Sequence, residues 1–198
     1  MKTRIAVFVS GGGTNLQALI DAARRGELAS GELALVLSSS DRAYALTRAA
    51  NAGIPTAVVR SKEPEHEQKI LNALAEHRID MIVLAGYMSI LSEDFTARFP
   101  NRILNVHPSL IPAFCGRGYY GLRVHEEALK RGVKVTGATV HFVNEIPDGG
   151  EILLQKAVEV LPGDTPETLQ RRVMQQAEWK LLPQATETVA RRIMEEKQ

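Results

Sequence analysis

Amide, imidazole and carboxylate side chains gather in the second half of the chain, at the ends of apolar segments. Asn105 and His107 directly follow Ile103–Leu104, and a second β-branched segment, Thr139–Val143, runs into Asp148 and two glycines. Alternation along a strand puts Asn105 and His107 on the same side. An imidazole moves protons near neutral pH, a carboxylate beside it favours the imidazolium, and an amide NH2 can hold an oxyanion. The residue types therefore predict acyl transfer.

Short apolar segments alternate with amphipathic ones, and these elements must position the polar side chains. Five runs have the composition of strands buried on both faces: Ile5–Val9, Leu33–Leu37, Thr56–Val59, Met81–Leu84 and Ile103–Val106. Helix-period stretches lie between them, at Asn15–Arg25, Ala43–Ala52 and Glu65–His77. This alternation predicts an α/β fold with a mostly parallel twisted sheet and helices on both faces, which binds ligands at the carboxyl ends of its strands.

The C-terminal part is predicted to depart from this pattern. Lys134–Val143 and Ile152–Val158 favour two further strands, antiparallel to the rest, on either side of the Asp148 turn. One long helix, from about Pro166 to Glu196, is expected to follow. We expect it to be interrupted or kinked near Pro183, because proline lacks an amide N–H.

Composition limits the class of protein. The chain has 198 residues, 44% of them hydrophobic, which predicts one domain with a substantial core. A formal net charge of +1 argues against a nucleic-acid-binding protein, which needs an excess of basic residues. Cys115 is the single cysteine, so no internal disulfide can form. We find no signal peptide and no apolar run of the ~18–20 residues that a membrane helix needs, and therefore expect a cytoplasmic protein.

Glycines after the first apolar run form a candidate phosphate site. Gly11 and Gly13 do not complete the dinucleotide motif, because Leu16 stands where a third glycine is required, and no Gly-Lys-[Ser/Thr] completes a P-loop. The amides of this turn, at the positive end of the helix predicted over Asn15–Arg25, suit a single phosphate monoester. Thr14 either adds a hydroxyl to that site or caps the helix.

Several motifs in a fixed order resemble one known family. Asn105-x-His107-Pro-Ser-Leu-Ile-Pro is followed by Thr139-Val-His-Phe-Val and by Asp148-Gly-Gly, and Ser10–Gln17, Leu84–Ser92 and Arg172–Glu178 add further matches. Together they resemble the formyltransferases that use 10-formyltetrahydrofolate, and among them those whose acceptor is glycinamide ribonucleotide (GAR). The resemblance covers nearly the whole chain. It implies a Rossmann-like formyltransferase fold in a single domain, 1–198, with a phosphate-binding half at about 1–100 and a catalytic and folate-binding half at about 80–198.

The resemblance also implies a reaction and the residues that perform it. A formyl group would pass from 10-formyltetrahydrofolate, consumed as a co-substrate, to the amine of 5'-phosphoribosylglycinamide in de novo purine biosynthesis, with no metal, in a monomer or homodimer. Asn105, His107 and Asp148 would be catalytic, with Thr139 and His141 around them. The residues implied in substrate binding are Gly13, Thr14, Asn15, Gln175, Gln176 and Glu178. Those implied in cofactor binding are Met88, Ser89, Ile90, Leu91, Asn105, Asn144, Glu145, Ile146, Pro147 and Asp148.

Other interpretations of these residues stay open. A formyltetrahydrofolate deformylase would use a similar trio with water as acceptor, and a non-catalytic nucleotide-binding module would keep only the fold. The glycine- and tyrosine-rich loop Ala113–Gly121 is either a lid beside His107 or tolerated extra length. Cys115 is interpreted as a packing residue rather than a nucleophile, and Ser109 lacks the Gly-x-Ser-x-Gly setting of a serine hydrolase. No His, Cys and Asp spacing suggests a metal site.

Overall fold

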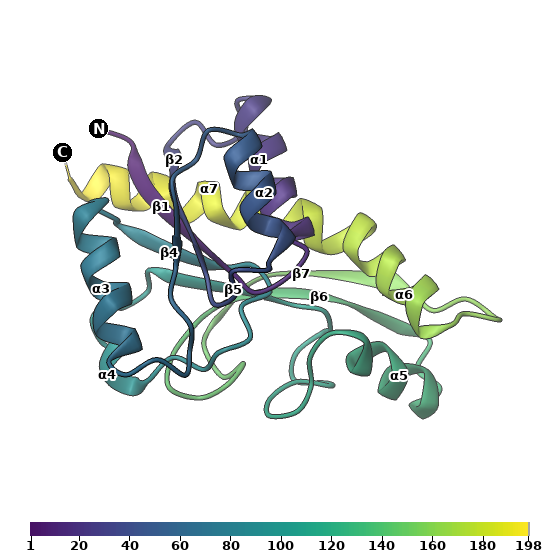
Figure 1. Cartoon of the computed structure of the whole chain (residues 1–198). Helices are drawn as coiled ribbons and strands as arrows, with labels where there is room; N and C mark the ends of the chain where they lie inside the picture. Colours follow the sequence, from purple (N-terminus) through teal and green to yellow (C-terminus); the bar gives the residue numbers. More distant parts are fainter. Residues whose placement is uncertain (198) are drawn as a thin grey trace.

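A computed structural model describes residues 1–197 and contains a seven-stranded sheet in the order β3-β2-β1-β4-β5-β6-β7 (Figure 1). The first five strands in the chain pair in parallel, whereas β6 and β7 are antiparallel to their neighbours. The predicted α/β fold with antiparallel strands in its C-terminal part is confirmed. The strands are β1 (Thr3–Val9), β2 (Gly31–Ser38), β3 (Thr56–Val58), β4 (Met81–Leu84), β5 (Ile103–His107), β6 (Val135–Phe142) and β7 (Ile152–Glu159).

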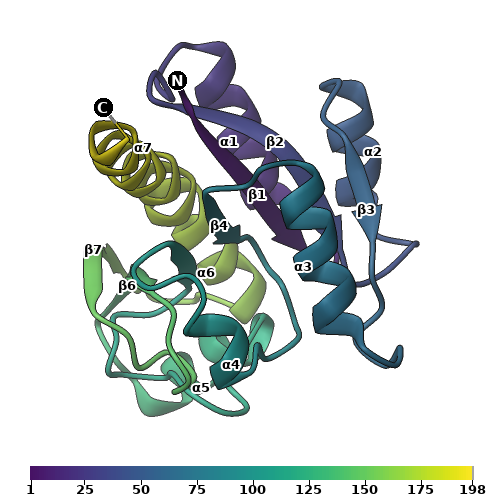
Figure 2. The same cartoon turned by 90° about the vertical axis from the view of Figure 1, so that its left-hand side faces the viewer.

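Helices cover both faces of the sheet, and side-chain alternation along β1 supplies a core to each face. Ile5 and Val7 pack in the core shared with α1, α2 and α7, whereas Ala6 and Phe8 pack in the core shared with α3 and α4 (Figures 1 and 2). The helices are α1 (Thr14–Arg24), α2 (Tyr44–Asn51), α3 (His66–Glu76), α4 (Glu93–Thr96), α5 (Leu122–Arg131), α6 (Pro166–Val173) and α7 (Trp179–Glu196), with a π-helix, η1 (Met174–Glu178), between the last two. None of them is both long and apolar enough to cross a membrane, as far as residues 1–197 are concerned.

The long C-terminal helix is present, but its interruption lies earlier than we predicted. Helix α7 continues through Pro183, and the irregular turn is the π-helix Met174–Glu178 that precedes it. Proline has no amide N–H, and its ring crowds the carbonyl four residues earlier, so the helix adjusts its hydrogen bonding in the turn before the proline. The expectation of a break near Pro183 itself is therefore wrong by about one turn.

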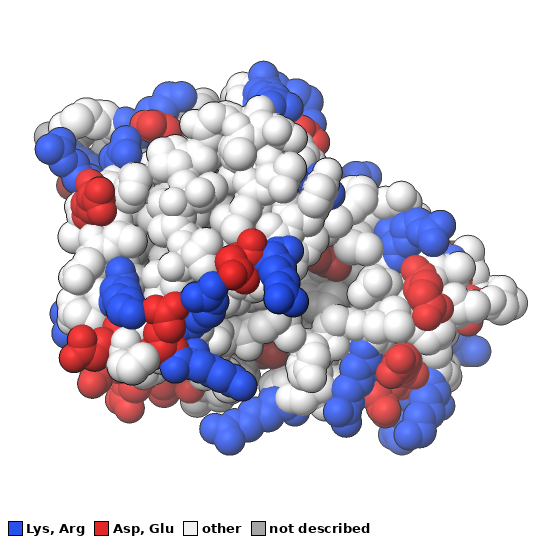
Figure 3. Space-filling model, in the orientation of Figure 1, with Lys and Arg blue, Asp and Glu red and all other residues white. Residues whose placement is uncertain are grey.

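The parallel pairing brings three chain segments to one edge of the sheet. β1, β4 and β5 are neighbours that run in the same direction, so the loop after Val9, the segment after Leu84 and the residues at the end of β5 leave the sheet at the same edge. Ligands of open α/β sheets bind at this edge. In the space-filling view, side chains of both charge signs surround a hollow in the face shown (Figure 3).

Candidate active site

The predicted catalytic side chains meet at the end of β5. Asp148 Oδ2 lies 3.5 Å from His107 Nδ1, and Asp148 Oδ1 lies 3.4 Å from Asn105 Nδ2. His141, which we had expected only around the site, joins them: its Nε2 lies 3.2 Å from Asn105 Nδ2 and 3.4 Å from Asp148 Oδ1. The reason is the register of β5 and β6, which pairs Asn105 directly with His141 and His107 with Thr139. Cross-strand partners point to the same face of a sheet.

The hydrogen-bond partners of the imidazoles place their protons. His107 Nε2 is 2.8 Å from the carbonyl oxygen of Phe114, and His141 Nδ1 is 2.7 Å from that of Phe142. A carbonyl oxygen only accepts, so both of these ring nitrogens carry a proton. The other nitrogen of His141, Nε2, faces both Asn105 and Asp148. The Nδ1 of His107, which faces Asp148, is protonated only when the ring is an imidazolium.

Burial and charge act in opposite directions on His107. Burial lowers the pKa of His107 and outweighs the Asp148 carboxylate, which raises it, so the pKa lies below its ordinary value and the ring is neutral near pH 7. Burial also opposes ionisation of Asp148. Even so, the contacts with His141 and His107 and the N–H of Gly116, 2.8 Å from Oδ2, together leave the pKa of Asp148 below its usual value. A neutral imidazole beside an ionised carboxylate is poised to accept a proton.

The turn that carries Asp148 needs its particular residues. Asp148 has a φ of 55°, in the left-handed region that aspartate tolerates better than most side chains. A Cβ on Gly150 would lie 1.8 Å from the carbonyl oxygen of Phe142, so only glycine allows the chain to pass so close to the end of β6. The Asp-Gly-Gly motif is thus also a structural requirement for presenting the carboxylate.

The loop Ala113–Gly121 belongs to the site through its backbone. It supplies the Phe114 carbonyl that binds His107 and the Gly116 N–H that binds Asp148. Burial, followed by the charge of Asp148, raises the pKa of Cys115, which keeps the thiol protonated and disfavours a nucleophilic role. Ser109 is fully buried and its hydroxyl donates to the Ala113 carbonyl, so it too is structural.

Most of the predicted cofactor residues line one cavity of about 130 Å³ next to Asn105 and Asp148. Ser92, which follows these residues, caps α4 by accepting from the amide of Phe95. Met88 does not line the cavity: its side chain is 56% exposed, and its amide donates to the hydroxyl of Ser10. The lining residues are Leu84, Tyr87, Ser89, Ile90, Leu91, Asn105, His141, Val143, Asn144, Glu145, Ile146, Pro147 and Asp148.

The predicted substrate residues come together from opposite ends of the chain. Asn15 Nδ2 donates to Glu178 Oε2 over 2.7 Å, and both side chains are buried. Burial raises the pKa of Glu178 to about 7. The Oδ1 of Asn15 is buried and has no hydrogen-bond partner among residues 1–197. Gln175 and Gln176 lie on the same π-helix and are exposed.

Thr14 does not cap α1, because Gly13 occupies the cap position with a φ of 72°. The Thr14 hydroxyl instead contacts Met174 Sδ at 3.8 Å. A Cβ on Gly13 would lie 2.6 Å from the Cβ of Ala45 in α2. Glycine is therefore required here by the packing of α2 as well as by the backbone conformation, and a substitution of Gly13 would disturb both.

His125 is fully buried in α5, and neither ring nitrogen has a partner among residues 1–197. Burial, and then the neighbouring charge of His107, lowers its pKa to about 4. Because the folded-state value lies below the unfolded-state value, its contribution to stability is complete above about pH 6.5 and is lost as the pH falls toward 4.

We predict that His125→Leu makes the protein less sensitive to acid. Wild-type protein should lose about 2 kcal/mol from this group between pH 7.5 and pH 5, and the variant should not. Urea unfolding at both pH values measures the difference, with His66→Leu as a control that removes a less buried imidazole from α3. Equal acid sensitivity of His125→Leu and wild type would contradict the prediction.

Comparison with known proteins agrees with this geometry. The Formyl transferase family model matches residues 3–186. A phosphoribosylglycinamide formyltransferase of Haemophilus influenzae is 42% identical over 91% of this chain and 84% of its own length. The crystal structure of phosphoribosylglycinamide formyltransferase from Brucella melitensis, 44% identical, superposes with a TM-score of 0.86 over 96% of each chain.

A human relative, the trifunctional purine biosynthetic protein adenosine-3, is 45% identical over 96% of this chain. The chain spans only 18% of the length of that relative, so the comparison concerns one part of it. Among residues 1–197, no group of three or more His, Cys, Asp or Glu side chains is arranged to hold a metal ion. The family match and the full-length relatives agree with each other, and the chain belongs to the formyl transferase family.

Proposed function

We propose that this protein transfers the formyl group of 10-formyltetrahydrofolate to the amine of 5'-phosphoribosylglycinamide. The observation that carries the proposal is that Asn105, His107 and Asp148 meet beside a cavity. The glycine loop at the start of α1 leaves the sheet at the same edge. The names of the full-length relatives in Haemophilus influenzae and Brucella melitensis support this acceptor.

The reaction follows from the positions of these groups. The substrate amine attacks the formyl carbon, a C–N bond forms, and a tetrahedral intermediate with an oxyanion results. Asn105 and the imidazolium of His107 stabilise that oxyanion. The amine proton passes through His107 to N10 of the folate, and the bond between the formyl carbon and N10 breaks. No covalent enzyme intermediate is needed.

The charge states of the free enzyme suit this sequence of steps. His107 starts neutral, because it is buried, and negative charge that develops in the site favours its protonation. Ionised Asp148 at 3.5 Å from Nδ1 then stabilises the imidazolium. The N–H at Nε2 is occupied by the Phe114 carbonyl, so the loop Ala113–Gly121 must release this contact before that N–H can bind the formyl oxygen. This favours a lid over tolerated extra length.

The two substrates have separate places in the proposal. The folate lies in the cavity lined by Ser89–Leu91 and Asn144–Asp148, and the exposed Met88, which precedes Ser89, also contacts it. The nucleotide phosphate binds the amides around Gly13–Asn15, and its ribose lies near Glu178, Gln175 and Gln176. The proposal also includes a single domain with a phosphate-binding half at about 1–100 and a folate-binding half at about 80–198, in a cytoplasmic monomer or homodimer without nucleic-acid or membrane partners.

A formyl-transfer assay with three acceptors tests the proposal. Formylated GAR should accumulate at the rate at which 10-formyltetrahydrofolate is consumed. Rapid folate turnover in buffer alone would indicate a deformylase, and transfer to charged initiator tRNA would indicate a different formyltransferase. Binding of GAR without turnover of the folate would indicate a non-catalytic nucleotide-binding module.

A further inference from the structure

Helix α2 packs directly against the glycine loop and binds its carbonyl groups. The amide of Ala45 donates to the carbonyl oxygen of Gly11 over 3.1 Å. The Nε of Arg48, one turn further along α2, donates to the carbonyl oxygen of Gly12 over 2.8 Å. Successive peptide groups of the loop are thus held from the α2 side, one by the helix N-terminus and one by a guanidinium.

The planarity of the peptide bond converts this contact into an orientation of the amides. In a trans peptide the C=O of one residue and the N–H of the next point in opposite directions. When the carbonyls of Gly11 and Gly12 point toward α2, the N–H groups of Gly12 and Gly13 point away from it. Among residues 1–197, no group accepts a hydrogen bond from the amides of Gly12, Gly13 or Thr14, so all three are free for an anion.

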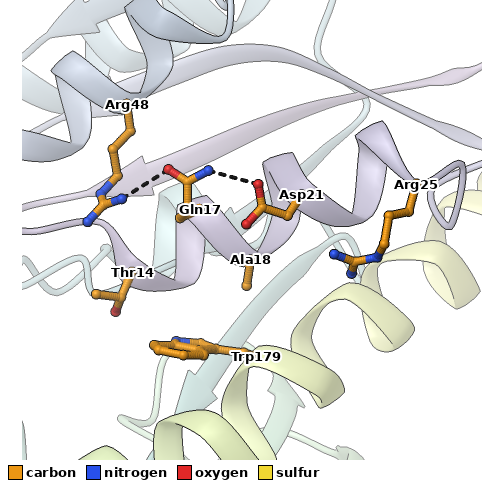
Figure 4. Close-up of a pocket in the computed structure, with 7 residues that line it drawn as sticks. All are labelled: Thr14, Gln17, Ala18, Asp21, Arg25, Arg48 and Trp179. Carbon is orange, nitrogen blue, oxygen red and sulfur yellow. Dashed lines mark hydrogen bonds between the residues drawn. The ribbon is translucent and has the colours of Figure 1, made fainter.

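Arg48 is held in place by further contacts. Its Nη1 donates to Gln17 Oε1 over 3.0 Å, and Gln17 in turn donates to Asp21 over 2.9 Å along α1 (Figure 4). The guanidinium also lies 5.0 Å from the ring centroid of Tyr44. The groups that Arg48 contacts directly, the Gly12 carbonyl, the Gln17 amide and the Tyr44 ring, carry no charge. These contacts therefore do not neutralise the guanidinium, and its positive charge contributes to the electrostatic potential at the glycine loop.

We infer that Arg48 is a positioning residue for phosphate recognition: it orients the Gly12–Gly13 peptide so that the loop amides face the substrate phosphate, and it adds positive charge on the opposite side of the loop. This inference rests on the proposed function, because it assigns the loop to the phosphate of the nucleotide. A preorganised set of amides binds an anion better than a flexible one, since the cost of ordering the loop is already met.

The variant Arg48→Gln is expected to weaken phosphate recognition selectively. The KM for GAR should rise about 10- to 100-fold, the range for loss of a hydrogen bond with a charged donor, while kcat and the KM for 10-formyltetrahydrofolate stay close to wild type. Arg48→Lys keeps the charge but not the planar fork, so its KM for GAR should lie between the two. Arg42→Gln removes an exposed charge just before α2 and should change none of these three constants.

Calorimetric titration with ribose 5-phosphate separates this inference from the proposed reaction, because it needs no turnover. Affinity should fall by the same factor in Arg48→Gln, by less in Arg48→Lys, and not in Arg42→Gln. If Arg48→Gln does not fold, the several-fold loss expected of Arg48→Lys carries the test. Thermal melting of each variant identifies a general loss of structure.

The possible results decide between the two claims. GAR formylation by the wild type with an unchanged KM for GAR in Arg48→Gln would overturn the inference and leave the reaction standing. A second possible result is that the protein only hydrolyses 10-formyltetrahydrofolate and still binds ribose 5-phosphate in a way that depends on Arg48. That result would uphold the inference and overturn the proposed reaction. A parallel loss of folate affinity in Arg48→Gln would assign Arg48 to the fold alone. No binding of ribose 5-phosphate by the wild type would overturn the inference, and the acceptor assay would still decide the reaction.

Discussion

His107→Ala and Asn105→Ala are each expected to lower kcat by about 10² or more, because a positioned proton relay or an oxyanion donor typically contributes at least this factor. His107 contacts Asp148 through Nδ1 and the Phe114 carbonyl through Nε2, and alanine keeps neither contact. Asn105 lies between Asp148 and His141, which fixes the direction of its NH2 group.

Steady-state kinetics with saturating GAR and folate measure this effect. Dissociation constants of both ligands should change far less than kcat, because the lost interactions develop mainly in the transition state. Thermal melting shows whether each variant is folded. A folded His107→Ala protein with near-normal turnover would exclude the proposed proton relay.

Asp148→Asn is expected to lower kcat by at least about tenfold and to move the histidine limb of the pH dependence of kcat/KM to lower pH. The carboxylate raises the pKa of His107, although burial keeps the net value below the ordinary one, so removal of the charge lowers that pKa further. Loss of the charge also weakens the stabilisation of the imidazolium, and a hydrogen bond with a charged partner contributes about 1.5–3 kcal/mol.

The control for this change is Glu151→Gln, which removes the same charge from an exposed position shortly after the same turn. It should change neither kcat nor the histidine limb of the pH dependence of kcat/KM, because screening by solvent weakens the effect of distant exposed charges. An unmoved limb in folded Asp148→Asn would assign Asp148 to the geometry of the turn alone, which its φ of 55° would by itself explain.

The strands and the position of the site were readable from the chain because both depend on local patterns. The apolar runs that predicted β1, β2, β4 and β5 are apolar because both faces of a central parallel strand are buried. Polar residues at the ends of such runs necessarily lie at one edge of the sheet. Asn105 and His107 could therefore be placed at the edge of the sheet where we propose that the ligands bind, before any contact was known.

Other features depend on contacts between segments distant in the chain, and the sequence alone did not determine them. The pairing of Asn105 with His141 is a matter of register between β5 and β6, which a motif does not specify. The same holds for Arg48, whose role arises only where α2 meets the glycine loop, and for the π-helix before Pro183. Nor could the direction of the His107 pKa shift be read from the neighbouring carboxylate, because desolvation by the surrounding layers outweighs that charge. Desolvation and register are properties of the assembled layers, so they exist only in the tertiary structure.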